Sequence, residues 1–155
     1  MTASPAAGPA AQGARAATIR ALQTALAAEH TAVYGYAVAG AHLAGPRQQV
    51  VTRGWIAHQQ ARDTLIAMVA ALGAQPVPAS ATYQLPFPVR DAQSAAALLA
   101  LLEDGLATAY LGVVALTSDR LRLFGAHGVR TAALRATGWR GSTLAFPGLQ
   151  PAAGG

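Results

Sequence analysis

Two glutamates and two histidines are the residues of this chain best suited to chemistry. Glu29 interrupts the small and apolar run "LAAEHTAVYGYAVAG" at residues 26–40, and Glu103 lies in a comparable run. A carboxylate in such surroundings is costly unless a cation, a metal ion or hydrogen-bond donors meet it. Because carboxylates and imidazoles together bind iron and manganese, one hypothesis is a metal site formed by Glu29, His58, Glu103 and His127.

Apolar residues that alternate in steps of four and three predict two helices in the first half of the chain. The first seam consists of Leu22, Leu26, Glu29, Val33, Tyr36, Gly40 and Leu43. The second seam consists of Val51, Trp55, His58, Arg62, Leu65, Val69 and Leu72. Gly45-Pro46 breaks the chain between them, so the two helices are expected to form an antiparallel hairpin. His30 and His42 lie off the seam and are expected to face solvent or an interface.

A second hairpin is predicted after a proline-rich segment. Residues 74–90 contain four prolines and no helical pattern, which predicts an extended crossover. Asp91 fits the N-cap of a third helix, whose inner face is Leu99, Glu103, Leu106, Tyr110 and Val113. A fourth helix is expected from about residue 119 to 139, with an inner face of Leu123, His127, Arg130 and Leu134.

Two hairpins joined by one long connection between the second and third helices are typical of the ferritin-like antiparallel four-helix bundle. We therefore predict an all-α fold of this architecture. Its di-iron members use a glutamate on each of two helices and an E-x-x-H motif on each of the other two. The matching stretches here read "WIAH" at 55–58 and "FGAH" at 124–127, so the ligand pattern is incomplete.

Arginines offer a second way to satisfy the two glutamates. Reflecting the first hairpin about its turn places Glu29 opposite Arg62, and reflecting the second places Glu103 near Arg130. A guanidinium neutralises a carboxylate through two hydrogen bonds and repels a nearby divalent cation. We therefore predict buried Glu29–Arg62 and Glu103–Arg130 pairs, in a polar network that also contains Asp63 and Tyr110.

Several short motifs together resemble a known family. They are "ALQTALAAEHTAVYGY" at 21–36, the H-x-x-x-R-D of residues 58–63, "YQLPFPV" at 83–89, Glu103 in mid-helix and "AFPGL" at 145–149. The combination resembles a ferritin-like domain family of unknown function from GC-rich, actinobacterial-type bacteria, over about residues 17–150. The resemblance implies a ferritin-like bundle and no established activity.

The ends of the chain are expected to lie outside the bundle. Apart from Met1, residues 1–16 offer no large apolar side chain, so we predict a flexible N-terminal tail, whose removal would leave the thermal midpoint almost unchanged. The bundle is expected to cover residues 17–150, with Leu144, Phe146 and Leu149 over one end. Residues 151–155 are expected to be loose.

Composition narrows the classes of protein that fit. The chain has no cysteine, which excludes disulfides and thiolate chemistry. The longest apolar run, Ala95–Leu102, is shorter than the roughly 20 residues of a membrane span, and no signal peptide is evident at the start. We therefore expect a cytoplasmic protein without a membrane segment. The net charge is +5, but the arginines of the fourth helix point in different directions, so nucleic-acid binding is not expected.

The sequence favours a non-catalytic interaction or structural protein without a cofactor, whose metal site has been replaced by Glu–Arg pairs. A homodimer through an alanine-rich helix face, or an unidentified protein partner, would fit this role. Two alternatives stay open. One is a metalloprotein that binds iron or manganese, and the other is a basic nucleic-acid-binding module.

Overall fold

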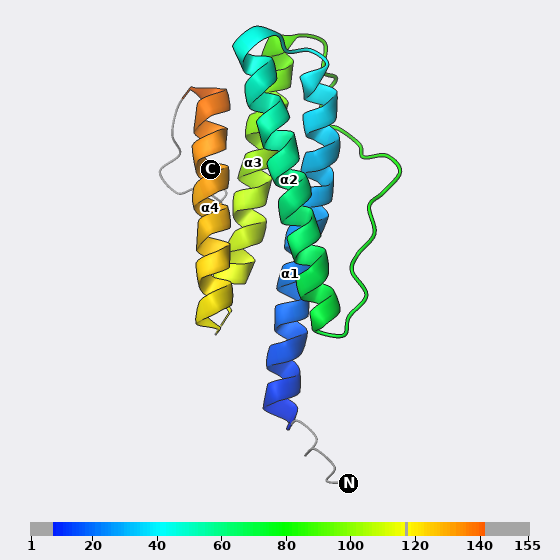
Figure 1. Cartoon of the computed structure of the whole chain (residues 1–155), viewed down its shortest axis with the longest axis vertical. Helices are drawn as coiled ribbons and strands as arrows, with labels where there is room; N and C mark the ends of the chain where they lie inside the picture. Colours follow the sequence, from blue (N-terminus) through cyan, green and yellow to red (C-terminus); the bar gives the residue numbers. More distant parts are fainter. Residues whose placement is uncertain (1–7, 117, 142–155) are drawn as a thin grey trace, which may run out of the picture.

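The described part of this chain folds into four long helices. The computed structural model describes residues 8–116 and 118–141. Within these ranges it contains no strand, and its helices are α1 (Pro9–Gly40), α2 (Gly45–Ala71), α3 (Ala92–Val114) and α4 (Asp119–Arg140) (Figure 1). The predicted all-α, four-helix fold is confirmed. The predictions for Leu144, Phe146, Leu149 and residues 151–155 fall outside the described residues.

Local sequence signals explain where these helices begin and end. The Asp91 carboxylate accepts a hydrogen bond from the Ser94 amide at 2.8 Å, and the Ser94 hydroxyl accepts one from the Asp91 amide, which completes a capping box at the start of α3. Ser118 caps α4, which ends at Gly141 in the left-handed conformation with φ of 80°. The predicted boundaries of the second hairpin therefore agree closely with the structure.

The start of α1 differs from the prediction. The helix begins at Pro9, eight residues before the expected start at residue 17, because alanine favours helix and proline suits the first turn. Residues 8–16 are exposed, as expected of a segment without large apolar side chains. The Arg15 guanidinium nevertheless donates a hydrogen bond to the Leu72 carbonyl oxygen. This part of α1 is therefore helical and tied to the end of α2.

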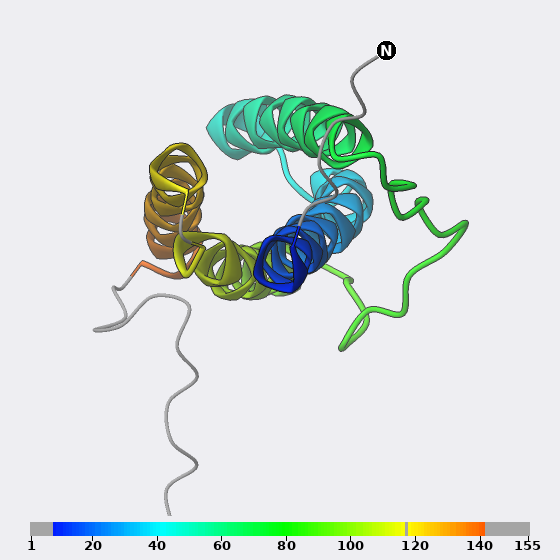
Figure 2. The same cartoon turned by 90° about the horizontal axis from the view of Figure 1, so that it is seen from below.

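The helices are arranged as an open arc (Figure 2). Their order across the arc is α2, α1, α3, α4, because α1 contacts α2 and α3, and α4 contacts α3. In the described part of the chain, no Cα atom of α4 lies within 8 Å of a Cα atom of α1 or α2. Neighbouring helices are antiparallel, and the connection from residue 72 to 91 runs back along the length of α1 and α2 (Figure 1).

Side chains of α1 fix this connection to the helices. Gln23 accepts a hydrogen bond from the Val77 amide at 2.8 Å, and its own amide group donates to the Gln75 carbonyl. His30 Nε2 lies 3.0 Å from the Val77 carbonyl oxygen, and the residue is buried. The prediction that His30 faces solvent or an interface is therefore wrong, because the crossover covers it.

The core consists of two apolar clusters with a polar layer between them. One cluster consists of Tyr36, Ala39, Leu43, Val51, Ala95, Leu98 and Leu99. The other consists of Leu22, Ala25, Leu26, Ala32, Leu65, Val69, Leu106, Ala107, Tyr110, Val113 and Ala132. Along α2 and α3, the buried polar residues His58 and Glu103 fall between the two sets. The predicted inner face of α3 is buried at every position.

The predicted inner face of α4 is wrong. Leu123 and Leu134 are 73% and 63% exposed, and His127 and Arg130 are exposed as well. The buried residues of α4 are Gly125, Ala132 and Ala136. A Cβ atom added at Gly125 would lie 2.8 Å from the Val114 backbone nitrogen. The closest approach of α4 to α3 is therefore made by its smallest residues, and Leu123 and Leu134 face outward.

By length and composition alone, α3 could cross a membrane. It lies at the centre of the arc, however, with α1 on one side and α4 on the other. Its Glu103 is fully buried and hydrogen-bonded within the protein. These are the features of a central core helix.

Candidate polar site

A histidine bridged between two glutamates forms the centre of the protein. His58 Nδ1 lies 2.8 Å from Glu29 Oε2, and His58 Nε2 lies 3.1 Å from Glu103 Oε1. The three residues come from α2, α1 and α3, and each is at most 2% exposed. When the ring is protonated, both N–H groups donate to carboxylates. One imidazolium can then satisfy two buried carboxylates at once.

Two tyrosines complete the hydrogen bonding of the carboxylates. The Tyr110 hydroxyl donates to Glu29 Oε1 at 2.7 Å, and the Tyr36 hydroxyl donates to Glu103 Oε1. The Tyr36 oxygen in turn accepts a hydrogen bond from Trp139 Nε1 at 3.3 Å. We call Glu29, His58, Glu103, Tyr36 and Tyr110 the central network. Within it, Glu103 Oε2 alone has no hydrogen-bond partner among the described residues.

Glycines allow the tyrosine rings to reach the network. A Cβ atom added at Gly54 of α2 would lie 2.4 Å from the Tyr36 ring, and one at Gly128 of α4 would lie 2.5 Å from the Tyr110 ring. Each tyrosine ring therefore occupies space that the side chain of any residue other than glycine at Gly54 or Gly128 would fill. Tyr36 and the two glycines were not among the predicted site residues. A tyrosine on a seam that also carries glutamate was the available signal.

Charge and burial set the protonation of the network. Burial by itself lowers the pKa of His58, but the hydrogen bonds with Glu103 and Glu29 and the charges of these residues outweigh it and raise the pKa to about 8. Burial, with the charge of the glutamate it contacts, raises the pKa of Tyr36 and of Tyr110. At neutral pH the network therefore holds an imidazolium and two neutral tyrosines.

The predicted Glu–Arg pairs are wrong. Arg62 pairs with its neighbour Asp63 at 2.8 Å on the outside of α2, and Arg130 is exposed on α4. Neither arginine reaches a glutamate of the central network in the described structure. A guanidinium is expensive to desolvate, and its long stem reaches water from a seam position. His58, one turn earlier on the same seam, meets both glutamates instead. Tyr110 belongs to the network as predicted, and Asp63 does not.

The predicted metal ligands come together only in part. Glu29, His58 and Glu103 converge, while His127 is exposed and lies 3.5 Å from the Thr131 hydroxyl. A two-metal carboxylate centre of the bundle type uses four glutamates and two histidines. In residues 8–116 and 118–141, no three side chains of metal-binding type are placed to hold an ion. The donor set does not fit a di-iron centre, because both nitrogens of His58 already face carboxylates.

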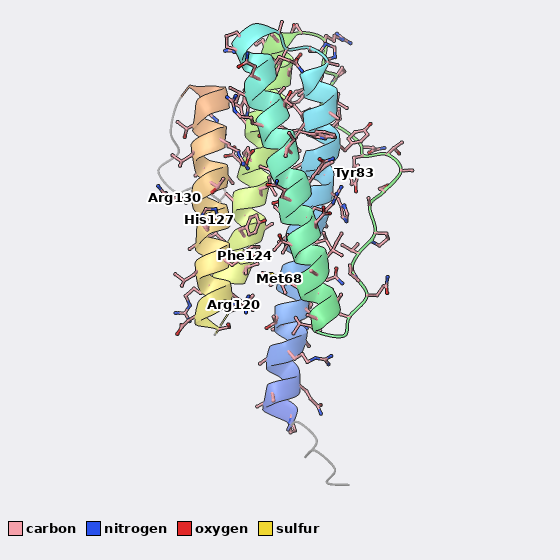
Figure 3. The ribbon with its side chains drawn as sticks, in the orientation of Figure 1. Met68, Tyr83, Arg120, Phe124, His127 and Arg130 are labelled. Carbon is pink, nitrogen blue, oxygen red and sulfur yellow. The ribbon has the colours of Figure 1, made fainter. Side chains whose placement is uncertain are left out.

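A cavity of about 240 Å³ connects this network to the space between α2 and α4. Its lining includes Glu29, His58 and Glu103 at the inner end, and His127 and Arg135 from α4. Figure 3 places Phe124, His127 and Arg130 along α4. The Phe124 ring packs against Tyr110 with ring centroids 5.8 Å apart. The network is therefore buried, but water-sized molecules can approach it from one side.

The raised pKa of His58 predicts a stability that depends on pH. The folded value of about 8 lies above the unfolded value of about 6.5. The contribution of His58 is therefore complete below pH 6.5 and is lost as the pH rises through 8. We expect the free energy of unfolding to fall by about 2 kcal/mol between pH 6 and 9, which urea denaturation at the two pH values would measure.

Two variants serve as controls for this pH effect. The His58→Gln variant should lose the pH dependence, while His42→Gln, a change at a partly exposed position outside the network, should keep it. An equal fall in stability in wild type and His58→Gln would show that another group titrates.

Comparisons with known proteins give a family and a structural relative. A family model described as "Domain of unknown function (DUF4439)" matches residues 21–151. A solved structure with the same arrangement is that of a conserved hypothetical protein, rv2844, from Mycobacterium tuberculosis. It has 35% sequence identity and a TM-score of 0.76, over 81% of this chain and 96% of the other. A search of the curated proteins found no match.

Proposed function

Because the chain belongs to the DUF4439 family, whose function is unknown, we propose a function from its fold and site: it is a non-catalytic interaction protein on a ferritin-like scaffold. Two antiparallel helix hairpins joined by the long connection of residues 72–91 support the ferritin-like topology. The glutamates of α1 and α3 lie side by side at mid-helix, at the level where a metal centre of this architecture would be held.

One observation carries the non-catalytic part of the proposal: His58 fills the position between Glu29 and Glu103 and contacts both. Its single positive charge offsets one of the two carboxylate charges, in the place where metal ions would otherwise balance them. The two tyrosine hydroxyls add one donor to each carboxylate. In this proposal the network is a structural element that fixes α1, α2 and α3 relative to one another.

The open side of the arc supports the interaction part of the proposal. In a closed four-helix bundle each helix packs along two neighbours. Within the described chain α2 packs closely along α1 alone and α4 along α3 alone, apart from side-chain contacts of His58 with Glu103 and of Trp139 with Tyr36. Large apolar side chains stay exposed on both, including Val50, Ile56, Leu123 and Leu134. Val50 and Leu134 line a groove between α2 and α4, and exposed apolar residues beside a groove are typical of surfaces that bind another protein.

Metal analysis tests this proposal. Protein expressed with iron and manganese supplied, and purified without chelators, is expected to contain far less than one metal ion per chain by mass spectrometry. Replacing His127 with alanine should leave the metal content unchanged, because His127 is exposed and outside the network. A content of one or more ions per chain that falls in both Glu29→Gln and His127→Ala would overturn the proposal and establish the metalloprotein alternative.

A further inference from the structure

A groove with a basic rim follows the open side of the arc between α2 and α4. Its outer part has a volume of about 580 Å³ and takes Arg47 and Val50 from α2. From α4 it takes Arg130, Thr131, Leu134, Arg135, Gly138 and Trp139. Thr131 and Arg135 also line the cavity beside the central network, so the groove continues inward from there.

Within the described structure, the arginines of this groove form no ion pair with an acidic residue. No aspartate or glutamate lines its outer part. Among the described residues, the arginine ion pairs are Arg62 with Asp63 and Arg140 with Asp104. Arg47, Arg130 and Arg135 therefore form no ion pair in the described structure, and Arg135 lies where the groove meets the cavity that Glu29 and Glu103 line. Three cations around one groove produce a positive potential that favours an anionic occupant.

The floor of the groove is apolar and exposed. Leu134 is 63% exposed and Val50 is 44% exposed, and both line the groove together with the half-buried Trp139. Burying these side chains would be favourable at about 25 cal/mol per Å² of apolar surface. An occupant therefore needs an apolar face for the floor and negative charges for the rim.

We propose that the α2–α4 groove binds an acidic amphipathic helix of a partner protein, in a proposal that rests on the interaction function above. The lining residues of α4 extend from Phe124 to Trp139, a rise of about 22 Å, which matches a helix of about 15 residues. Leucine-type residues would lie on Val50, Leu134 and Trp139, and carboxylates would pair with the arginines. The partner helix would close the open side of the arc.

Charge argues against a second copy of this chain as the occupant. The chain has a net charge of +5, and a two-fold contact through the groove would bring Arg47, Arg130 and Arg135 of both copies together. Like charges that face each other across an interface oppose association. The same arginines attract an acidic helix and so favour its binding.

A pair of synthetic peptides tests the proposal on the full-length protein. Both are fluorescein-labelled, have 15 residues and are held helical by a side-chain staple. They share a leucine face and differ in carrying either glutamate or lysine at the remaining positions. Fluorescence anisotropy is expected to show that the glutamate peptide binds, that its binding weakens as salt rises, and that the lysine peptide binds at least tenfold more weakly.

Matched charge reversals locate the binding. The Arg47→Glu, Arg130→Glu variant changes two exposed groove residues and is expected to bind the glutamate peptide at least tenfold more weakly than wild type does. The Arg53→Glu, Arg120→Glu variant makes the same charge change at exposed positions outside the groove, and should bind nearly as well as wild type. An equal loss of affinity for the glutamate peptide in both variants would overturn the proposal, and so would equal binding of the two peptides to wild type.

Other occupants have their own outcomes, each of which overturns the proposal. Self-association that the groove variant abolishes would indicate a second copy of this chain. Tighter peptide binding after deletion of residues 142–155 would indicate that this segment occupies the groove. Displacement of the glutamate peptide by a duplex oligonucleotide would indicate a nucleic acid. The metal content is measured separately. If the protein is free of metal but does not bind the glutamate peptide, only the assignment of the groove is contradicted. If the protein contains stoichiometric metal, the proposed function itself is contradicted.

Discussion

Replacing His58 with leucine is expected to lower the free energy of unfolding by about 3–5 kcal/mol, the cost of stranding a buried charge. The change removes the one cation between Glu29 and Glu103 and leaves both carboxylates buried, with only tyrosine hydroxyls as partners. Chemical denaturation at pH 6.5 measures this loss.

A matched variant separates the network from simple core packing. Replacing all five network residues by apolar ones (Glu29→Leu, His58→Leu, Glu103→Leu, Tyr36→Phe and Tyr110→Phe) removes the charges and their donors together. This variant should lose much less stability than His58→Leu, because few buried polar groups are left without partners. If the single variant were as stable as wild type, the histidine would not be the group that satisfies the carboxylates.

Replacing Gly125 with leucine is expected to lower the free energy of unfolding by about 3 kcal/mol. A Cβ atom at this position would lie 2.8 Å from the Val114 nitrogen and 3.1 Å from the Tyr110 carbonyl oxygen. These are backbone atoms, which cannot move aside as a flexible side chain can. The larger residue must therefore force α4 away from α3, and thermal or chemical denaturation would measure the result.

Gly105 provides the control for Gly125. It lies in α3 on an exposed face, and a Cβ atom there would meet nothing within 4 Å. Gly105→Ala is expected to raise stability by about 0.5–1 kcal/mol, because alanine favours helix over glycine. If Gly125→Leu were equally well tolerated, the close approach of α3 and α4 would not be a packing contact on which stability depends.

Hydrophobic spacing predicted three of the four helix faces. The seams of α1, α2 and α3 carry large side chains, and most of their members are buried, as are Leu26, Leu65 and Leu106. On α4 the large residues mislead, since Leu123 and Leu134 face outward. The informative pattern there was the spacing of Gly125, Gly128, Ala132 and Ala136, whose small side chains allow another helix to approach closely.

The partner of Glu29 could not be derived from hairpin register. Register predicted Arg62 at the level of Glu29, but the level along a helix does not decide which side chain turns inward. The cost of desolvating a guanidinium favours the smaller imidazole of His58, which reaches a third helix as well. The sequence contains both candidates on the same seam. Only their packing against Glu103 distinguishes them, and that contact joins residues 45 positions apart.

The linear order α2, α1, α3, α4 has a consequence for how the molecule opens. Helix α4 sits at one end of the row, so its departure breaks its interface with α3 and the Trp139–Tyr36 hydrogen bond, and leaves the contacts of α1 with α2 and α3 in place. Proteins open in such cooperative units at a lower free energy than that of global unfolding. Backbone amides of α4 should therefore exchange with solvent deuterium sooner than those of α1 and α3. The native ensemble would then contain a minor population of three-helix molecules in which the central network meets water.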